Sequence, residues 1–72
     1  MKRFYLLRWE QWNYEHNCFY SYGAEYENKA AAMREFEQTK LSAGLPKVQV
    51  WEQLRKNDGF VQAQRRLAIK EF

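Results

Sequence analysis

The sequence is poor in residues that break or cross-link a chain. Its 72 residues include one cysteine, one proline, three glycines and one histidine. A lone cysteine cannot form an internal disulfide, whereas small secreted domains usually carry a dense, even set of cysteines. Proline and glycine are the strongest local breakers of regular structure. Their scarcity therefore predicts that most of the chain lies in helices and strands.

Long hydrophobic runs are also missing. The apolar run near the N-terminus spans only Phe4 to Leu7, which is shorter than the roughly 7–15 residues of a signal-peptide core. No stretch approaches the ~20 apolar residues that a membrane-spanning helix needs, and neither end carries a lipidation motif. We therefore expect a soluble, cytoplasmic protein in a reducing compartment, with no membrane partner.

Patterns typical of catalytic or metal sites are absent as well. His16 and Cys18 stand two residues apart, but a thiol nucleophile needs a base and an orienting group, and a zinc site usually needs four ligands. We expect His16 in a turn, Cys18 as a small buried apolar residue, and Glu25 and Glu27 as solvated charges. The glycines are isolated, which excludes a phosphate-binding loop. The sequence thus predicts a non-enzymatic protein with no catalytic residues, metal, cofactor or small-molecule substrate.

What the sequence does have is large apolar side chains, with 46% hydrophobic and 18% aromatic residues. That content can bury enough surface to offset the conformational entropy of the chain, so a disordered tail is excluded. A chain of this length forms one domain. We expect residues 1–72 to make a single small α+β domain, too small for a deep enzyme cleft.

The first third of the chain predicts a β-hairpin. Residues 3–12 are rich in aromatic and large aliphatic types, which suit strands, and residues 13–17 are polar turn formers. From residue 18 the apolar side chains alternate at period two, which places them on one face of a second strand. The members of that face are Cys18, Tyr20, Tyr22, Ala24 and Tyr26.

The middle of the chain predicts one helix, at about 28–42. Asn28 can cap its N-terminus, residues 29–37 are mostly strong helix formers, and Gly44 stands where a C-terminal stop is expected. The expected apolar face consists of Ala30, Met33, Phe36 and Leu41, with Ala32 and Ala43 near its edge.

The last third predicts a second hairpin, with strands at 48–55 and 61–69. The dipeptide Asp58-Gly59 favours a two-residue type I′ turn, which would pair Val48 with Ile69, Val50 with Leu67, Glu52 with Arg65 and Leu54 with Ala63. A three-residue loop with Gly59 in a bulge would shift the register by one residue. We favour the first loop because a one-residue slip spoils the apolar face. The predicted fold is thus ββαββ, an antiparallel sheet of two hairpins with one helix packed on one face.

The aromatic residues gather in the first hairpin, since nine of the thirteen lie in residues 1–26. One helix cannot cover both faces of this hairpin, and interfaces favour Tyr and Trp. Filling a small core with large aromatics is the simpler explanation. Our first hypothesis is a small interaction protein that binds a protein partner or itself as a homo-oligomer. Its expected contact residues are Tyr5, Trp9, Trp12, Tyr20 and Tyr22.

The positive charge lies in the second hairpin. Residues 1–45 hold six basic and six acidic side chains, and residues 46–72 hold six basic and three acidic ones, so the net charge of +3 belongs to the latter. Arginine can contact bases and phosphates, and tryptophan can stack on a base. The alternative hypothesis is therefore a nucleic-acid-binding protein, or an inhibitor of a nucleic-acid-handling protein of the type that phages and mobile elements encode. Its expected contact residues are Trp51, Arg55, Lys56, Arg65 and Arg66.

Overall fold

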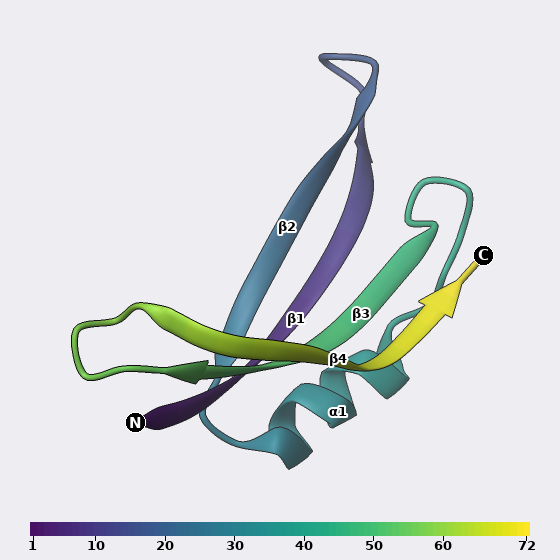
Figure 1. Ribbon diagram of the computed structural model, residues 1–72. Coiled ribbons are helices and arrows are strands. Elements are labelled where there is room, and N and C mark those ends of the chain that lie inside the picture. Colours follow the sequence, from purple (N-terminus) through teal and green to yellow (C-terminus); the bar gives the residue numbers. More distant parts are fainter.

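The computed structural model describes residues 1–72 and contains four strands and one helix. The elements are β1 (Lys2–Asn13), β2 (Cys18–Tyr26), α1 (Lys29–Gln38), β3 (Lys47–Arg55) and β4 (Val61–Glu71). The strands form one antiparallel sheet in the order β2-β1-β3-β4, and α1 lies across one face of it (Figure 1). The predicted ββαββ fold is confirmed. The helix has neither the length nor the hydropathy to cross a membrane.

The first hairpin has the alternation that the sequence predicts. Residues of β1 and β2 pair in regular register, so that Leu7 lies opposite Ala24 and Trp9 opposite Tyr22. In the turn, the side-chain oxygen of Asn13 accepts hydrogen bonds from the backbone N–H groups of Glu15 and His16, both at 3.0 Å. This Asx turn reverses the chain, and His16 lies in the turn as expected.

The helix begins where predicted but ends earlier. The side chain of Asn28 accepts from the backbone N–H of Ala30 at 2.7 Å, so it is the N-cap. The predicted end near residue 42 is wrong, because α1 stops at Gln38. The hydroxyl of Thr39 donates to the carbonyl of Glu35 at 2.7 Å, and Thr39 itself is extended. The backbone N–H of Thr39 also donates to the carbonyls of Glu35 and Phe36, so Thr39 is the C-cap and the helix ends where its backbone becomes extended.

Gly44 is not the helix stop. It lies in a tight turn after the helix, closed by two backbone hydrogen bonds of 3.0 Å between Ser42 and Leu45. Its φ is not positive, so it does not adopt the left-handed conformation of a glycine cap. The expected role of Gly44 is wrong because α1 already ends at its C-cap, Thr39, five residues before Gly44.

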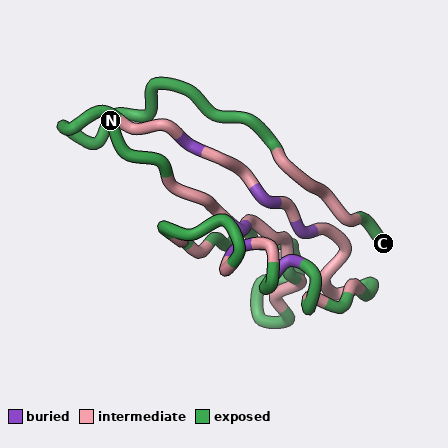
Figure 2. Tube along the Cα trace, turned by 90° about the horizontal axis from the view of Figure 1, so that it is seen from below, coloured by how far each residue is buried: buried purple, intermediate pink, exposed green.

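The core is small and lies between α1 and the middle of the sheet. Its buried hydrophobic members are Leu7, Ala32, Phe36, Val48 and Val50. The expected helix face is rotated, because Ala32 is buried completely while Ala30 is exposed. A small side chain at Ala32 lets the helix approach the sheet closely. Figure 2 shows the buried positions in the middle of the sheet and on the helix, with the ends of both hairpins exposed.

The turn of the second hairpin is the three-residue alternative. The backbone N–H of Lys56 donates to the carbonyl of Phe60 at 2.9 Å, and Gly59 has a φ of 91°. The favoured type I′ turn is wrong, because it needs positive φ at both central residues and Asp58 lacks it. Glycine adopts this conformation without steric cost, so a single left-handed residue, Gly59, suffices.

Two irregularities then reset the register between β3 and β4. The one between Leu54 and Arg55 restores the predicted pairing, so Leu54 lies opposite Ala63 and Glu52 opposite Arg65. The one between Val50 and Trp51 shifts it again. The predicted pairs Val50–Leu67 and Val48–Ile69 are therefore wrong, and Ala68 and Lys70 take those places. A β-bulge inserts one extra residue on one strand. The two-residue periodicity of a strand does not predict where such a residue is inserted.

The second irregularity lets β4 reach the end of the helix. The ammonium group of Lys70 donates to the carbonyl oxygens of Glu37 at 3.3 Å and Thr39 at 3.0 Å. It also lies 4.9 Å from the ring centroid of Phe36. A cation at the C-terminus of a helix satisfies free carbonyls and the negative end of the dipole. Lys70 thus joins the second hairpin to α1.

Candidate interaction surfaces

A row of aromatic rings follows the first hairpin on the side that α1 occupies. Trp9 and Tyr22 stack with their ring centroids 5.9 Å apart, and Tyr20 lies 6.4 Å from Tyr22. His16, in the turn, lies 5.5 Å from Tyr20 and is hydrogen-bonded to its hydroxyl. These four residues are called the aromatic ladder below. The ladder exists because cross-strand partners and alternate residues of one strand share a face.

The outer half of this hairpin extends beyond the rest of the sheet (Figure 1). Pairing between β1 and β3 ends at Glu10 and Lys47. Beyond that point β1 pairs only with β2, and one backbone hydrogen bond, from the N–H of Trp12 to the carbonyl of Gly44 at 2.8 Å, joins the hairpin to the rest of the protein. On the face opposite the ladder, Trp12 packs edge-on against Phe19 at 5.0 Å. The projecting ribbon therefore carries aromatic rings on both faces.

The five residues predicted as a partner surface do not form one patch. Tyr5 and Trp9 are packed against the core, whereas Tyr22 is 41% exposed. Tyr5, Trp9, Tyr20 and Tyr22 share the α1 side of the hairpin, and Trp12 lies on the other side. The structure thus brings four of them onto one face, with the inner pair serving the core and the outer pair open to solvent on one side.

Cys18 is exposed, so the prediction that it is buried is wrong. It is the first residue of β2, opposite Asn13 at the far end of the hairpin. The helix, which covers only the inner part of the hairpin, does not reach that end. Alternation places a residue on a face but does not show how far the covering layer extends.

The sheet face opposite α1, called the uncovered face below, is crossed by a polar network. The guanidinium of Arg55 donates to Gln53 Oε1 from Nε at 3.1 Å and from Nη2 at 2.9 Å. Gln53 is only 5% exposed, and its Nε2 donates to Gln64 Oε1 at 3.0 Å. Arg55 also pairs with Glu25 at 2.5 Å and lies 4.3 Å from the ring centroid of Phe4. These contacts connect all four strands.

The sequence suggested that the carboxylate of Glu25 is a solvated charge, but in the structure it forms an ion pair with Arg55. The hydrogen bond from Arg55 lowers the pKa of Glu25 below its ordinary value of 4.5, and the positive charge of Arg55 acts in the same direction against a small opposing effect of burial. An opposite charge and a hydrogen bond both favour the ionised form. The charge of Arg55 is in turn neutralised within the sheet, which makes Arg55 a structural residue.

The five residues predicted as a nucleic-acid surface are dispersed. Trp51 and Arg66 are partners across β3 and β4 on the uncovered face. Arg65 points to the α1 side, where its Nε donates to Glu52 at 3.1 Å. Arg55 belongs to the polar network, and Lys56 lies in the exposed turn. Only Trp51 and Arg66 remain side by side, and the indole N–H of Trp51 donates to Gln49 Oε1 at 3.1 Å.

Arg8 is the basic residue of this face that the sequence analysis missed. Its guanidinium carbon lies 5.4 Å from the ring centroid of Trp51, and its side chain is in neither of the two ion pairs of the molecule. It could have been found from alternation, because Phe4, Leu6 and Arg8 follow one another at period two on the face that the helix does not cover.

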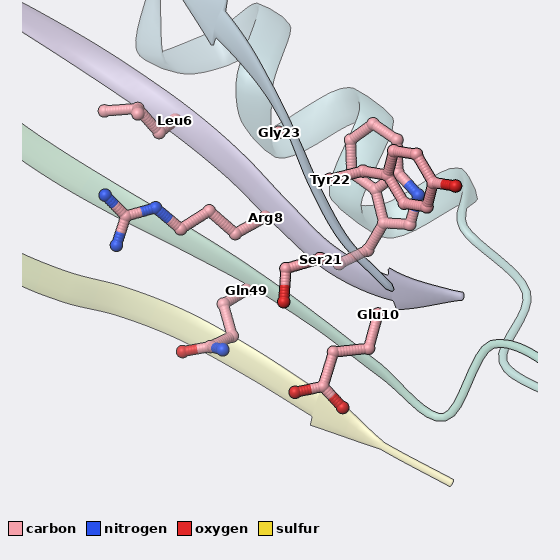
Figure 3. Close-up of a pocket in the computed structure, with 8 residues that line it drawn as sticks. Leu6, Arg8, Glu10, Ser21, Tyr22, Gly23 and Gln49 are labelled. Atoms are coloured by element: carbon pink, nitrogen blue, oxygen red, sulfur yellow. The ribbon is translucent and has the colours of Figure 1, made fainter. Parts of the chain in front are cut away.

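A shallow hollow of about 270 Å³ lies beside Arg8 on the uncovered face. Arg8, Ser21 and Gln49 project around it, and the lining includes the backbone of Gly23 (Figure 3). A Cβ on Gly23 would lie 3.5 Å from the carbonyl oxygen of Leu7, an ordinary contact, and Gly23 does not have positive φ. Neither backbone conformation nor crowding requires glycine here, so its effect is to keep the strand surface open.

The molecule thus has two candidate surfaces: a projecting hairpin that carries aromatic rings, and an open sheet face with one shallow hollow. No three His, Cys, Asp or Glu side chains come together in a group that could hold a metal ion. Comparison of the chain with protein-family models, with curated proteins and with solved structures finds no match.

Proposed function

We propose that this protein is a non-enzymatic interaction module that binds a protein partner or a second copy of itself through its first hairpin. The observation that carries the proposal is the projection of β1 and β2 beyond the sheet with aromatic rings on both faces. Phe19, in the projecting part, is 46% exposed, and Tyr22, at its base, is 41% exposed. Buried Tyr and Trp contribute strongly to protein interfaces.

The ribbon is also held rigid at its base, which favours binding. An isolated two-stranded hairpin is marginally stable. Here Trp9 packs against the core and stacks on Tyr22, and the ring of Tyr22 lies beside the ring of Tyr20. Side chains that are already ordered lose little conformational entropy when a partner covers them. The ladder therefore supports a pre-formed contact surface.

Affinity capture with matched variants tests the proposal. Phe19→Ser/Tyr22→Ser removes two half-exposed rings of the ribbon, and Phe60→Ser removes an exposed ring from the turn of the other hairpin. In nuclease-treated lysate of the source cells, we expect wild type and Phe60→Ser to retain the same partner, or a tagged second copy, and the double variant to lose it. Equal capture by all three proteins would overturn the proposal.

A second candidate, single-stranded nucleic acid on the uncovered face, is favoured by one observation. The guanidinium of Arg8 lies over the ring of Trp51 and takes part in no ion pair. Arg66 lies opposite Trp51 on the neighbouring strand β4. Bases can stack on aromatic side chains of an open sheet, and arginines can contact phosphates. Fluorescence anisotropy with labelled single-stranded DNA and RNA should then show binding that weakens steeply with salt and is lost in Trp51→Leu. No anisotropy change at low salt eliminates this candidate.

A further inference from the structure

We infer that the partner of the first hairpin is a second copy of this chain, and that two copies pair antiparallel through their β2 edges into one continuous sheet. The inference rests on the proposed function and names its partner. It starts from the two edges of the sheet, β2 and β4, because a strand edge offers unpaired N–H and C=O groups to another chain.

The β4 edge has the features that prevent such pairing. Charged side chains occupy four of its positions, namely Arg65, Arg66, Lys70 and Glu71. Its pairing with β3 is interrupted by two register shifts. Charges and bulges are the usual devices by which natural proteins blunt an exposed edge.

The β2 edge has a single charged residue and no register shift. Its sequence contains no Lys, Arg or Pro, and its nine pairs with β1 run without a register shift. Its one charged residue, Glu25, is held by Arg55 of β3 on the uncovered face. The strand is therefore regular along its whole length and carries no free basic side chain. This contrast between the two edges of one sheet points to β2 as the edge that pairs with another chain.

An antiparallel pair centred on Tyr22, the middle residue of Cys18–Tyr26, is self-complementary. Tyr22 would then lie opposite Tyr22 of the partner subunit, and Tyr20 opposite Ala24 of the partner subunit. Phe19 would lie opposite Glu25 of the partner subunit, so no like charges meet. Directly opposed residues have Cβ atoms ≈ 4.5–5.5 Å apart. Because Tyr22 already stacks on Trp9, the ladders of the two copies would meet at the two-fold axis.

The uncovered face fits the same arrangement. Ser21 would lie opposite Gly23 of the partner subunit, so only small side chains meet beside the two-fold axis. Both residues line the hollow next to Arg8, and the hollows of the two copies would join into one groove. This gives a reason for a glycine at a strand position where neither φ nor crowding requires one.

Sedimentation analysis over a wide concentration range, with one charge placed on each edge, tests the inference. Ser21→Lys puts a lysine on β2, and the matched control Gln62→Lys puts one on β4; both positions are exposed. We expect wild type and Gln62→Lys to reach the mass of two chains, and the dimer dissociation constant of Ser21→Lys to rise at least about tenfold. Far-ultraviolet circular dichroism checks that each variant is folded.

Disulfide trapping gives a second, independent readout. In a Cys18→Ser background, Tyr22→Cys places the thiols of the two copies opposite each other at the axis, whereas Gln62→Cys places them on β4. Mild oxidation should yield a covalent dimer with Tyr22→Cys and little with Gln62→Cys. If wild type stays monomeric and the two cysteine variants cross-link equally, the inference is overturned, as it is by a dimer that only Gln62→Lys disrupts. Hairpin-dependent capture of a different protein would then leave the proposed function standing.

Discussion

Replacing Arg55 by methionine separates a structural role of this residue from a role in nucleic-acid contact. Methionine keeps much of the apolar stem over the ring of Phe4 but removes the guanidinium. Gln53 Oε1, which accepts from Arg55 at 3.1 and 2.9 Å, loses both donors in a residue that is 5% exposed. The ion pair with Glu25 and the contact of the cation with the Phe4 ring are lost as well.

The size of the effect follows from these contacts. A buried acceptor left without a partner costs about 1–3 kcal/mol, the cation–π contact contributes about 0.5–1 kcal/mol, and a partly exposed ion pair about 0–1 kcal/mol. Because the contributions overlap, we expect Arg55→Met to lower the free energy of unfolding by about 2–3 kcal/mol. For a chain of this length the whole stability is about 4–11 kcal/mol, so the melting temperature should fall by about 10–20 °C.

Arg66→Met is the matched control, since Arg66 lies on the same face but is exposed and takes part in no ion pair. Such surface changes usually alter stability by less than about 0.5 kcal/mol. Urea unfolding followed by tryptophan fluorescence measures both variants. If Arg55→Met unfolds within 0.5 kcal/mol of Arg66→Met, the polar network does not stabilise the sheet and the reasoning is refuted.

Three further predictions concern the helix and the ion pair. Phe36→Ala removes the only large side chain of α1 that is fully in the core and should cost about 3–5 kcal/mol in urea unfolding; a cost below 1 kcal/mol would contradict the core described above. Lys70→Met removes the donor to the carbonyls of Glu37 and Thr39 and should cost about 1 kcal/mol, measured by thermal unfolding, with Lys70→Arg retaining part of it. Because the pKa of Glu25 is lowered in the folded protein, its stabilising effect is present above pH 4.5 and is lost as the pH falls through the folded pKa. Glu25→Gln should therefore flatten the acid limb of a stability–pH curve slightly, and an unchanged limb would argue against the pair.

Periodicity in the sequence predicts the elements well because each has a clear local signal. The alternation from Cys18 to Tyr26 places that strand and its faces correctly, and Asn28 marks the start of α1. Periodicity misses contacts between residues that are distant in the sequence, and it misses local features that involve a single residue, such as a bulge. The bulges of β4 and the extended backbone of Thr39 at the end of the helix leave no periodic trace, and the contact of Lys70 with the helix depends on one of those bulges.

The sequence also predicts part of each candidate surface, namely which residues lie on it but not how far they are buried or paired. Composition locates the aromatic residues in the first hairpin, and alternation assigns Tyr20 and Tyr22 to one face. It cannot show that Tyr5 and Trp9 serve the core while Tyr22 is half exposed, because that depends on how far α1 reaches. Charge counting likewise groups Arg55, Arg65 and Arg66, although Glu25 and Glu52 neutralise the first two and leave only the third free.

Residue-resolved amide hydrogen exchange, at dilute and at high protein concentration, tests most directly whether two copies of the chain pair through the β2 edge. We expect outward-facing amides of β2, around Tyr22, to exchange more slowly at high concentration, while those of β4 do not change. Slowing on β4, or unchanged exchange throughout β2, would contradict that pairing.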